Sequence, residues 1–155
     1  GEDLYRRGTY TFIKLTLPPP GMALFDASNR DQCEVKRSKT NTPLQALIMM
    51  NDPTVLEASR VLAQQLMVEQ LTTEEKIKKA FRLIICRKAS TKEKEILTAY
   101  FKEQLQLFQQ KKLDATATVK VGEYPAKQIA DTNSLAALMK TINTIYNMEE
   151  AITKS

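Results

Sequence analysis

Seven polar residues between positions 26 and 52 have side chains that could carry chemistry. They are carboxylates, guanidinium groups and an amide that follow a three-proline turn, namely Asp26, Arg30, Asp31, Glu34, Arg37, Asn41 and Asp52. If the fold brings them together, Asp26 and Arg30 would form a positioned carboxylate with its cation. Such a pair could bind a sugar or, through oxygen ligands, a metal ion. This polar cluster is the first candidate site in the sequence.

A structural role for the same cluster is the interpretation we favour. Asp26 and Ser28 have side chains that cap helices, and they precede a segment around residues 29–33 that could form a short helix. Arg30 and Arg37 would then pair with carboxylates as buried connectors. On this interpretation no residue of the cluster is catalytic and none binds a metal or a cofactor.

Aromatic and basic residues near the beginning of the chain form a second candidate group. Aromatic rings there, together with Phe25, could stack against sugar rings, but such side chains more often belong to a core or an interface. We expect an interface with a preceding part of the same domain. The arginines could bind an anionic ligand, although we expect them to form salt bridges at that contact. The candidate interface consists of Tyr5, Arg6, Arg7, Tyr10 and Phe12.

The absence of histidine from all 155 residues excludes several kinds of site within this chain. Ser-His-Asp and Cys-His nucleophilic systems need an imidazole, and so do histidine-ligated haem and the usual zinc sites. Cys33 and Cys86 are far apart in the sequence and form no CxxC or CxxCH motif. They could form a disulfide in an oxidising compartment, but two buried thiols are the simpler expectation. We therefore expect no cofactor in this chain.

The stretch TNTPLQALIMMNDPTV, residues 40–55, predicts two successive helix starts. Thr42 and Gln45 form a capping-box pattern, with Pro43 at the first helical position. Asp52 then caps a second helix, which also begins with proline. We expect the helix over residues 43–50 to be buried, because it is apolar on most of its sides.

Further capping patterns and apolar periodicity predict helices along the rest of the chain. Capping boxes at 72–75 and 90–93 each precede residues with an apolar face, another helix begins near Asn133, and a short turn or helix covers 148–153. Only four glycines and no tryptophan occur, which argues against sheet sandwiches and barrels. The sequence predicts an all-α irregular bundle of about five to seven helices. Residues 8–20 could form one short strand-like segment or a helix, and we favour the helix because no partner strand is evident elsewhere in the sequence.

We expect one helical domain over residues 1–155, excised from a longer protein. The chain begins with Gly1 instead of methionine, which favours such an origin. Its expected parts are a loop-rich N-terminal part (1–41), a helical core (42–112), an irregular connection (113–132) and a C-terminal helix (133–155).

The chain is moderately basic, with a net charge of +5 and a pI near 9.2. This charge permits an acidic partner without requiring one. The basic clusters are interrupted by acidic residues and lack the interleaved aromatic residues of single-strand-binding surfaces, so we do not expect nucleic-acid binding. No apolar run approaches the roughly 18–20 residues that span a bilayer, which predicts no transmembrane segment.

The segment from Leu4 to Ala58 resembles a known family in the order of its motifs. YRRGTYTF is followed by LPPPGMALFDASNRDQCEVKRSKTNTPLQALIMMNDPTVLEA, and AFRLIICRKAST and GEYP agree more loosely further on. These motifs are similar to the C-terminal part of a planctomycete-type secreted, cytochrome c-associated domain family of unknown function. Cys86 occupies a position where that family commonly has glycine, which weakens the case for a disulfide.

The resemblance implies a large bacterial protein exported to the periplasm or the cell surface. It also implies neighbouring cytochrome c-like modules, which would hold any haem. Because the family brings no reaction, our leading hypothesis is a non-catalytic scaffold or interaction domain. Its expected partners are the missing N-terminal part of the same domain and other modules of the parent protein, with a polysaccharide as a further candidate. The alternative is a part of a glycan-active enzyme whose other catalytic residues lie upstream.

Overall fold

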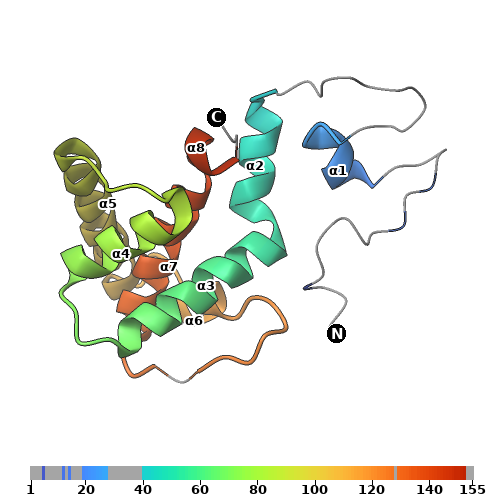
Figure 1. Ribbon diagram of the computed structural model, residues 1–155. Coiled ribbons are helices and arrows are strands. Elements are labelled where there is room, and N and C mark those ends of the chain that lie inside the picture. Colours follow the sequence, from blue (N-terminus) through green and yellow to red (C-terminus); the bar gives the residue numbers. More distant parts are fainter. Residues whose placement is uncertain are drawn as a thin grey trace. The chain divides into compact units, whose positions relative to one another are not determined.

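The computed structural model describes residues 5, 12, 14, 19–27, 40–127 and 129–152. These residues form helices and contain no β-sheet, which confirms the predicted all-α class (Figure 1). The predicted strand-like segment lies almost wholly outside the described residues. The chain divides into two compact units, residues 1–47 and 48–155. The predicted single domain with its four parts stays a prediction.

The first unit contains α1 (Pro20–Leu24), and α2 (Pro43–Asn51) begins in the first unit and ends in the second. The second unit continues with α3 (Pro53–Val68), α4 (Thr73–Ile85), α5 (Thr91–Gln109), α6 (Ala115–Val119), α7 (Thr132–Tyr146) and α8 (Glu149–Ile152). Five of the eight helices in the described part have seven residues or more, and the short α1, α6 and α8 complete the set. Within the described ranges, no helix combines the length and the apolar character needed to cross a bilayer.

The predicted helix starts are confirmed by their hydrogen bonds. The amide of Gln45 donates to Thr42 Oγ1 at 3.3 Å, and the Thr42 amide donates back to Gln45 Oε1 at 3.1 Å. Asp52 Oδ1 accepts the Thr54 amide at 2.8 Å at the start of α3. Reciprocal capping boxes also open α4 and α5. Local side chains therefore satisfy amides that the first turn of each helix leaves unpaired.

Helix α7 is the central element of the second unit. Nine of its fifteen residues are buried, and α3, α4, α5 and α6 all pack against it (Figure 1). Leu138, Met139 and Ile142 are fully enclosed there, together with Phe81 from α4. The core is therefore built around a helix that lies near the C-terminal end of the sequence.

The predicted burial of the helix at residues 43–50 is wrong. Gln45 is the buried residue of α2, whereas Leu44, Leu47 and Met50 are 47%, 55% and 51% exposed. One contact with α7 is a hydrogen bond from Asn143 Nδ2 to the Met49 carbonyl at 3.2 Å. Because apolar residues lie on most sides of α2, contact along one side leaves the others in solvent.

Candidate functional site

Asp26, from the candidate polar cluster, connects the end of α1 to the segment that precedes α2. Its carboxylate accepts the Thr40 amide at 2.7 Å and the Thr40 hydroxyl at 2.9 Å. Asp26 has φ of 55°, a left-handed conformation that aspartate tolerates better than most residues. The geometry gives Asp26 a connecting role within the first unit.

Gln45 completes this connection from inside α2. Its side chain is fully buried, and Nε2 donates to the Leu24 carbonyl at 2.7 Å and to Thr40 Oγ1 at 3.1 Å. The segments FDA (residues 25–27) and TNTPLQ (residues 40–45) therefore meet through Asp26, Thr40 and Gln45. This contact between two separated motifs is a structural reason for their joint occurrence in the chain.

The other members of the two candidate groups are placed only in part. Asn41 is exposed beside Thr40, and Asp52 caps α3 as predicted. Tyr5 and Phe12 are 52% and 84% exposed. Seven members lie outside the described residues, namely Arg6, Arg7, Tyr10, Arg30, Asp31, Glu34 and Arg37. The polar cluster and the N-terminal interface both stay predictions.

A second polar arrangement, on α3, was missed by the sequence analysis. Glu57, Arg60 and Gln64 follow one another at steps of three and four residues, which places them on one side of the helix. They are 8%, 1% and 4% exposed. Long polar side chains at helical spacing also fit a solvated helix face, so the sequence carries no signal that distinguishes this buried row.

The three side chains hold the backbone of the loop between α6 and α7. Arg60 donates from Nε to the Val121 carbonyl at 3.0 Å and from Nη2 to the Tyr124 carbonyl at 2.6 Å. Its Nη1 donates to Gln64 Oε1 at 3.1 Å, and Gln64 Nε2 donates to the Lys127 carbonyl at 3.2 Å. We call Glu57, Arg60 and Gln64 together with residues 121–127 the α3 clasp.

Glu57 binds the same loop through its amides. One carboxylate oxygen accepts the backbone N–H groups of Glu123 and of Tyr124, the latter at 3.1 Å. Gly122 lies directly beside this carboxylate with φ of 81°. A Cβ at position 122 would collide with the Glu57 side chain, so the clasp requires glycine there for space and for conformation.

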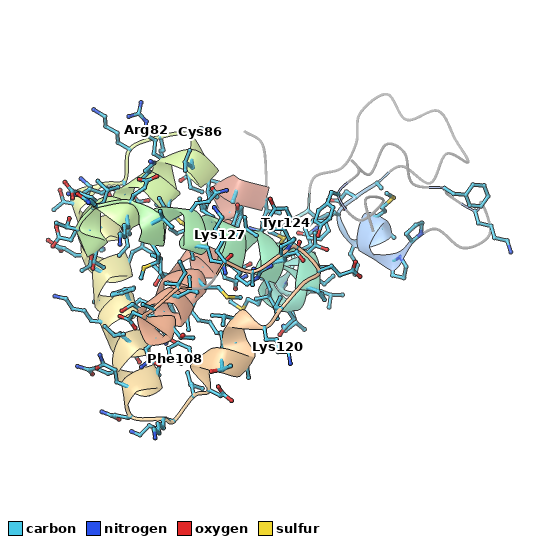
Figure 2. The ribbon with its side chains drawn as sticks, turned by 90° about the horizontal axis from the view of Figure 1, so that it is seen from below. Arg82, Cys86, Phe108, Lys120, Tyr124 and Lys127 are labelled. Carbon is cyan, nitrogen blue, oxygen red and sulfur yellow. The ribbon has the colours of Figure 1, made fainter. Side chains whose placement is uncertain are left out.

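The α3 clasp has the chemistry of a structural support. The three hydrogen bonds of Arg60 use all three of its guanidinium nitrogens, and two of them go to loop carbonyls. Lys120, Tyr124 and Lys127 are exposed along the loop, with Tyr124 at 50% (Figure 2). A buried polar row thus fixes the backbone of a loop whose side chains reach solvent.

An ionic cluster around Arg87, in the turn between α4 and α5, connects α4, α5 and α8. Arg87 Nη2 lies 2.6 Å from Glu93 Oε1 at the start of α5 and 2.7 Å from Glu150 Oε1 on α8. Its guanidinium carbon lies 5.0 Å from the ring centre of Phe81 on α4. Hydrogen bonds from Arg87 and from the Ser90 backbone lower the pKa of Glu93 to about 2. The pKa of Glu150 is also lowered, chiefly by Arg87.

The described part of the chain contains one of the two cysteines and several carboxylates that could be considered as metal ligands. There, histidine, cysteine and acidic residues form no group of three or more that could hold a metal ion. Cys86 is an exposed free cysteine with φ of 62° at the end of α4. Cys33 lies outside the described residues, so the state of the cysteine pair stays untested.

Comparison with known proteins adds a family and no function. A model of the family described as "PSD1: Protein of unknown function (DUF1553)" matches residues 1–101. The match covers the Asp26–Thr40–Gln45 connection and the α3 half of the clasp, and it ends before the loop. Neither the curated proteins nor the solved structures contain a significant match.

Proposed function

This chain belongs to the PSD1 (DUF1553) family of proteins of unknown function, and we propose that it acts as a non-catalytic interaction domain. In this proposal the chain is one part of a large exported bacterial protein that also contains cytochrome c-like modules. That setting rests on the motif resemblance from Leu4 to Ala58. The chain would dock against other modules of its parent protein and serve as a scaffold for their activities.

The observation that carries this proposal is how the buried polar groups of the second unit are used. Arg60, at 1% exposure, is the kind of buried cation that often marks an anion or substrate site. Here it donates to two loop carbonyls and to Gln64. Polar residues that hold backbone carbonyls and amides support a fixed surface more readily than a reaction.

The surface that Glu57, Arg60 and Gln64 hold in place is the solvent-facing side of the loop at residues 121–127. It presents a half-exposed aromatic ring at Tyr124 and exposed lysines at 120 and 127, all three labelled in Figure 2. Tyrosine contributes a large contact area with few rotatable bonds, which makes it a frequent anchor in interfaces. A loop held from below loses little further entropy on binding, so its contacts retain more of their energy.

Binding to the remaining modules of the parent protein tests the proposal. Those modules would be expressed separately and titrated with this chain by calorimetry. We expect a Tyr124→Ala variant to bind roughly tenfold more weakly or worse, as anchor residues do when truncated. Lys92→Ala, an exposed change on α5, is the matched control and should bind as the wild type does. Equal binding by Tyr124→Ala and the wild type would contradict the assignment of this surface.

The enzyme alternative makes a different prediction for the parent protein. It requires residues of the polar cluster, foremost Asp26, to take part in the turnover of a glycan. The hydrogen bonds from Thr40 to Asp26 support a connecting role. Glycan turnover that stops in Asp26→Asn without any loss of thermal stability would favour the enzyme instead.

A further inference from the structure

An open groove of about 650 Å³ lies along α4 in the second unit, and none of its lining residues belongs to the α3 clasp. Its volume lies within the range of small-molecule sites, which run from about 300 to 1,000 Å³. The α4 part of its wall consists of residues at helical spacing, namely Glu75, Lys78, Lys79, Arg82 and Leu83. The turn before α5 and the first turn of α5 close the other side through Lys88, Ala89 and Lys94.

The groove is strongly cationic because few of its charges are neutralised. Among its cations, Lys79 forms a salt bridge with Glu69 at 2.6 Å. The one carboxylate among the described lining residues, Glu75, accepts hydrogen bonds from Thr72 in the capping box of α4 and also attracts Lys78. Four remaining cations form no ion pair with any residue that the structure describes: Lys78, Arg82, Lys88 and Lys94. The Arg82 side chain extends away from the body of α4 (Figure 2).

Between these cations the groove has an apolar floor. Leu83 is 57% exposed on α4, although leucine gains free energy when it is buried. Leu71 and the buried Ala89 are the other apolar residues that line the groove. The site therefore offers apolar contact at its base and positive charge at its rim.

We propose that this groove binds a small amphiphilic anion, with its apolar tail on Leu71 and Leu83. The head would be a carboxylate, sulfate or phosphate group held by Arg82 with the neighbouring lysines, since a guanidinium pairs with such groups through two parallel hydrogen bonds. None of the described residues that line the groove is aromatic, which disfavours stacked bases and sugars as occupants. This inference is independent of the proposed interaction surface.

A neighbouring groove provides a contrast within the same helix pair. It encloses about 440 Å³ between α4 and α5, and Lys78 and Lys94 line both grooves. Glu74 and Glu95 line it together with Lys102, so its charges are mixed. The excess of positive charge belongs to the Arg82 side. Residues that line one groove only can therefore serve as test and control.

Calorimetric titration of the full chain with decanoate, below its micelle-forming concentration, tests the proposal. We expect saturable binding at least tenfold tighter than that of decanol, which lacks the charge, or of inorganic phosphate, which lacks the tail. The double variant Arg82→Gln/Lys88→Gln should lose at least tenfold in affinity, and Leu83→Asn should weaken binding similarly. Lys102→Gln, in the neighbouring groove, should bind as the wild type does. Circular dichroism checks that each variant and each complex remains folded.

Three results would overturn the inference. The first is the absence of decanoate binding by the folded wild type. The second is equal affinity in the wild type and in folded Arg82→Gln/Lys88→Gln or Leu83→Asn. The third is binding to phosphatidylglycerol vesicles without binding to monomeric decanoate, which would make the region a membrane-facing surface and not a site for a single molecule.

Discussion

Arg60 on α3 donates a hydrogen bond of 2.6 Å to the carbonyl of Tyr124, which lies 64 positions further along the chain. The donor is almost completely buried, while the side chain of the acceptor residue is half exposed. One contact thus links the interior of the second unit to its surface. The proposed function depends on this relationship, because it lets a buried residue set the shape of a loop that a partner can touch.

Removal of the Arg60 guanidinium should destabilise the chain and release the loop. Arg60→Met keeps much of the side-chain volume but leaves the carbonyls of Val121 and Tyr124 without their donors. We expect a loss of about 2–4 kcal/mol in the free energy of unfolding, measured by urea denaturation. Arg82→Met, on the exposed side of α4, is the control and should change stability by less than about 0.5 kcal/mol. An equally small change in Arg60→Met would contradict the clasp.

The fit between Gly122 and Glu57 predicts that two substitutions will not be additive. Gly122→Ala should cost about 2–3 kcal/mol, because it strains a positive-φ position and drives a Cβ into the Glu57 carboxylate. In a Glu57→Ala background the collision is absent, and the same change should cost only about 1 kcal/mol. A double-mutant cycle of unfolding free energies measures the difference. Equal costs in the two backgrounds would show that Gly122 does not lie against Glu57.

The left-handed conformation of Cys86 predicts a stabilising substitution. Cys86 ends α4 with φ of 62°, where glycine avoids the steric cost paid by other residues. Cys86→Gly should stabilise the chain by about 0.5–1 kcal/mol in thermal or urea unfolding. Lys111 also has a positive φ, of 56°, so Lys111→Gly should raise the free energy of unfolding for the same reason. Lys88→Gly is the control and should give no gain in stability. Destabilisation by Cys86→Gly would indicate that the thiol has a role that the fold does not explain.

The Arg87 cluster predicts a specific dependence of stability on acid pH. The pKa of Glu93 falls from an ordinary value of 4.5 to about 2 in the folded chain. A carboxyl group with a lowered folded pKa stabilises the native state above its unfolded pKa, and this contribution is lost as pH falls through the folded value. The contribution of Glu93 is therefore complete above about pH 4.5 and disappears towards pH 2.

Arg87→Gln removes the stabilisation of Glu93 and of Glu150 together, while the acidic caps outside this cluster remain in place. Unfolding free energies measured from pH 7 to pH 2 should fall less steeply below pH 4.5 in the variant than in the wild type. Raising the salt concentration should reduce the difference, since the cluster is partly exposed. Parallel pH profiles for the two proteins would mean that Arg87 does not set the pKa of Glu93.

Asp26→Asn in the intact parent protein separates the connecting role from a catalytic one. The substitution weakens the hydrogen bonds from Thr40 and should lower stability by about 1 kcal/mol. Whatever turnover the parent protein catalyses should continue at its original rate. Thermal unfolding and a turnover assay on the same preparation give both results.

The sequence predicted those features whose causes are local. Thr42 with Gln45, and Asp52 before a proline, determine helix starts through contacts within a few residues, and the structure contains those contacts. The α3 clasp was missed because its partners are backbone groups more than sixty positions away. Polar side chains at 57, 60 and 64 have the pattern of a solvated helix face until the loop that covers them is known.

The exposure of α2 could not be predicted for a related reason. Composition shows that a helix is apolar but does not show how many of its sides another element covers. Asp26 illustrates the same limit for the candidate site, since its bond to Thr40 spans fourteen positions. Four of the seven cluster residues also lie outside the described part, so their convergence remains a prediction.

The most direct test of the account is the affinity of Gly122→Ala for the separately expressed modules of the parent protein. This variant keeps Lys120, Tyr124 and Lys127 and alters only the backbone that presents them. If the α3 clasp sets the shape of a docking loop, the folded variant should bind at least tenfold more weakly than the wild type. Unchanged affinity in calorimetry, with the variant shown to be folded, would contradict the claim that the clasped loop is the interaction surface.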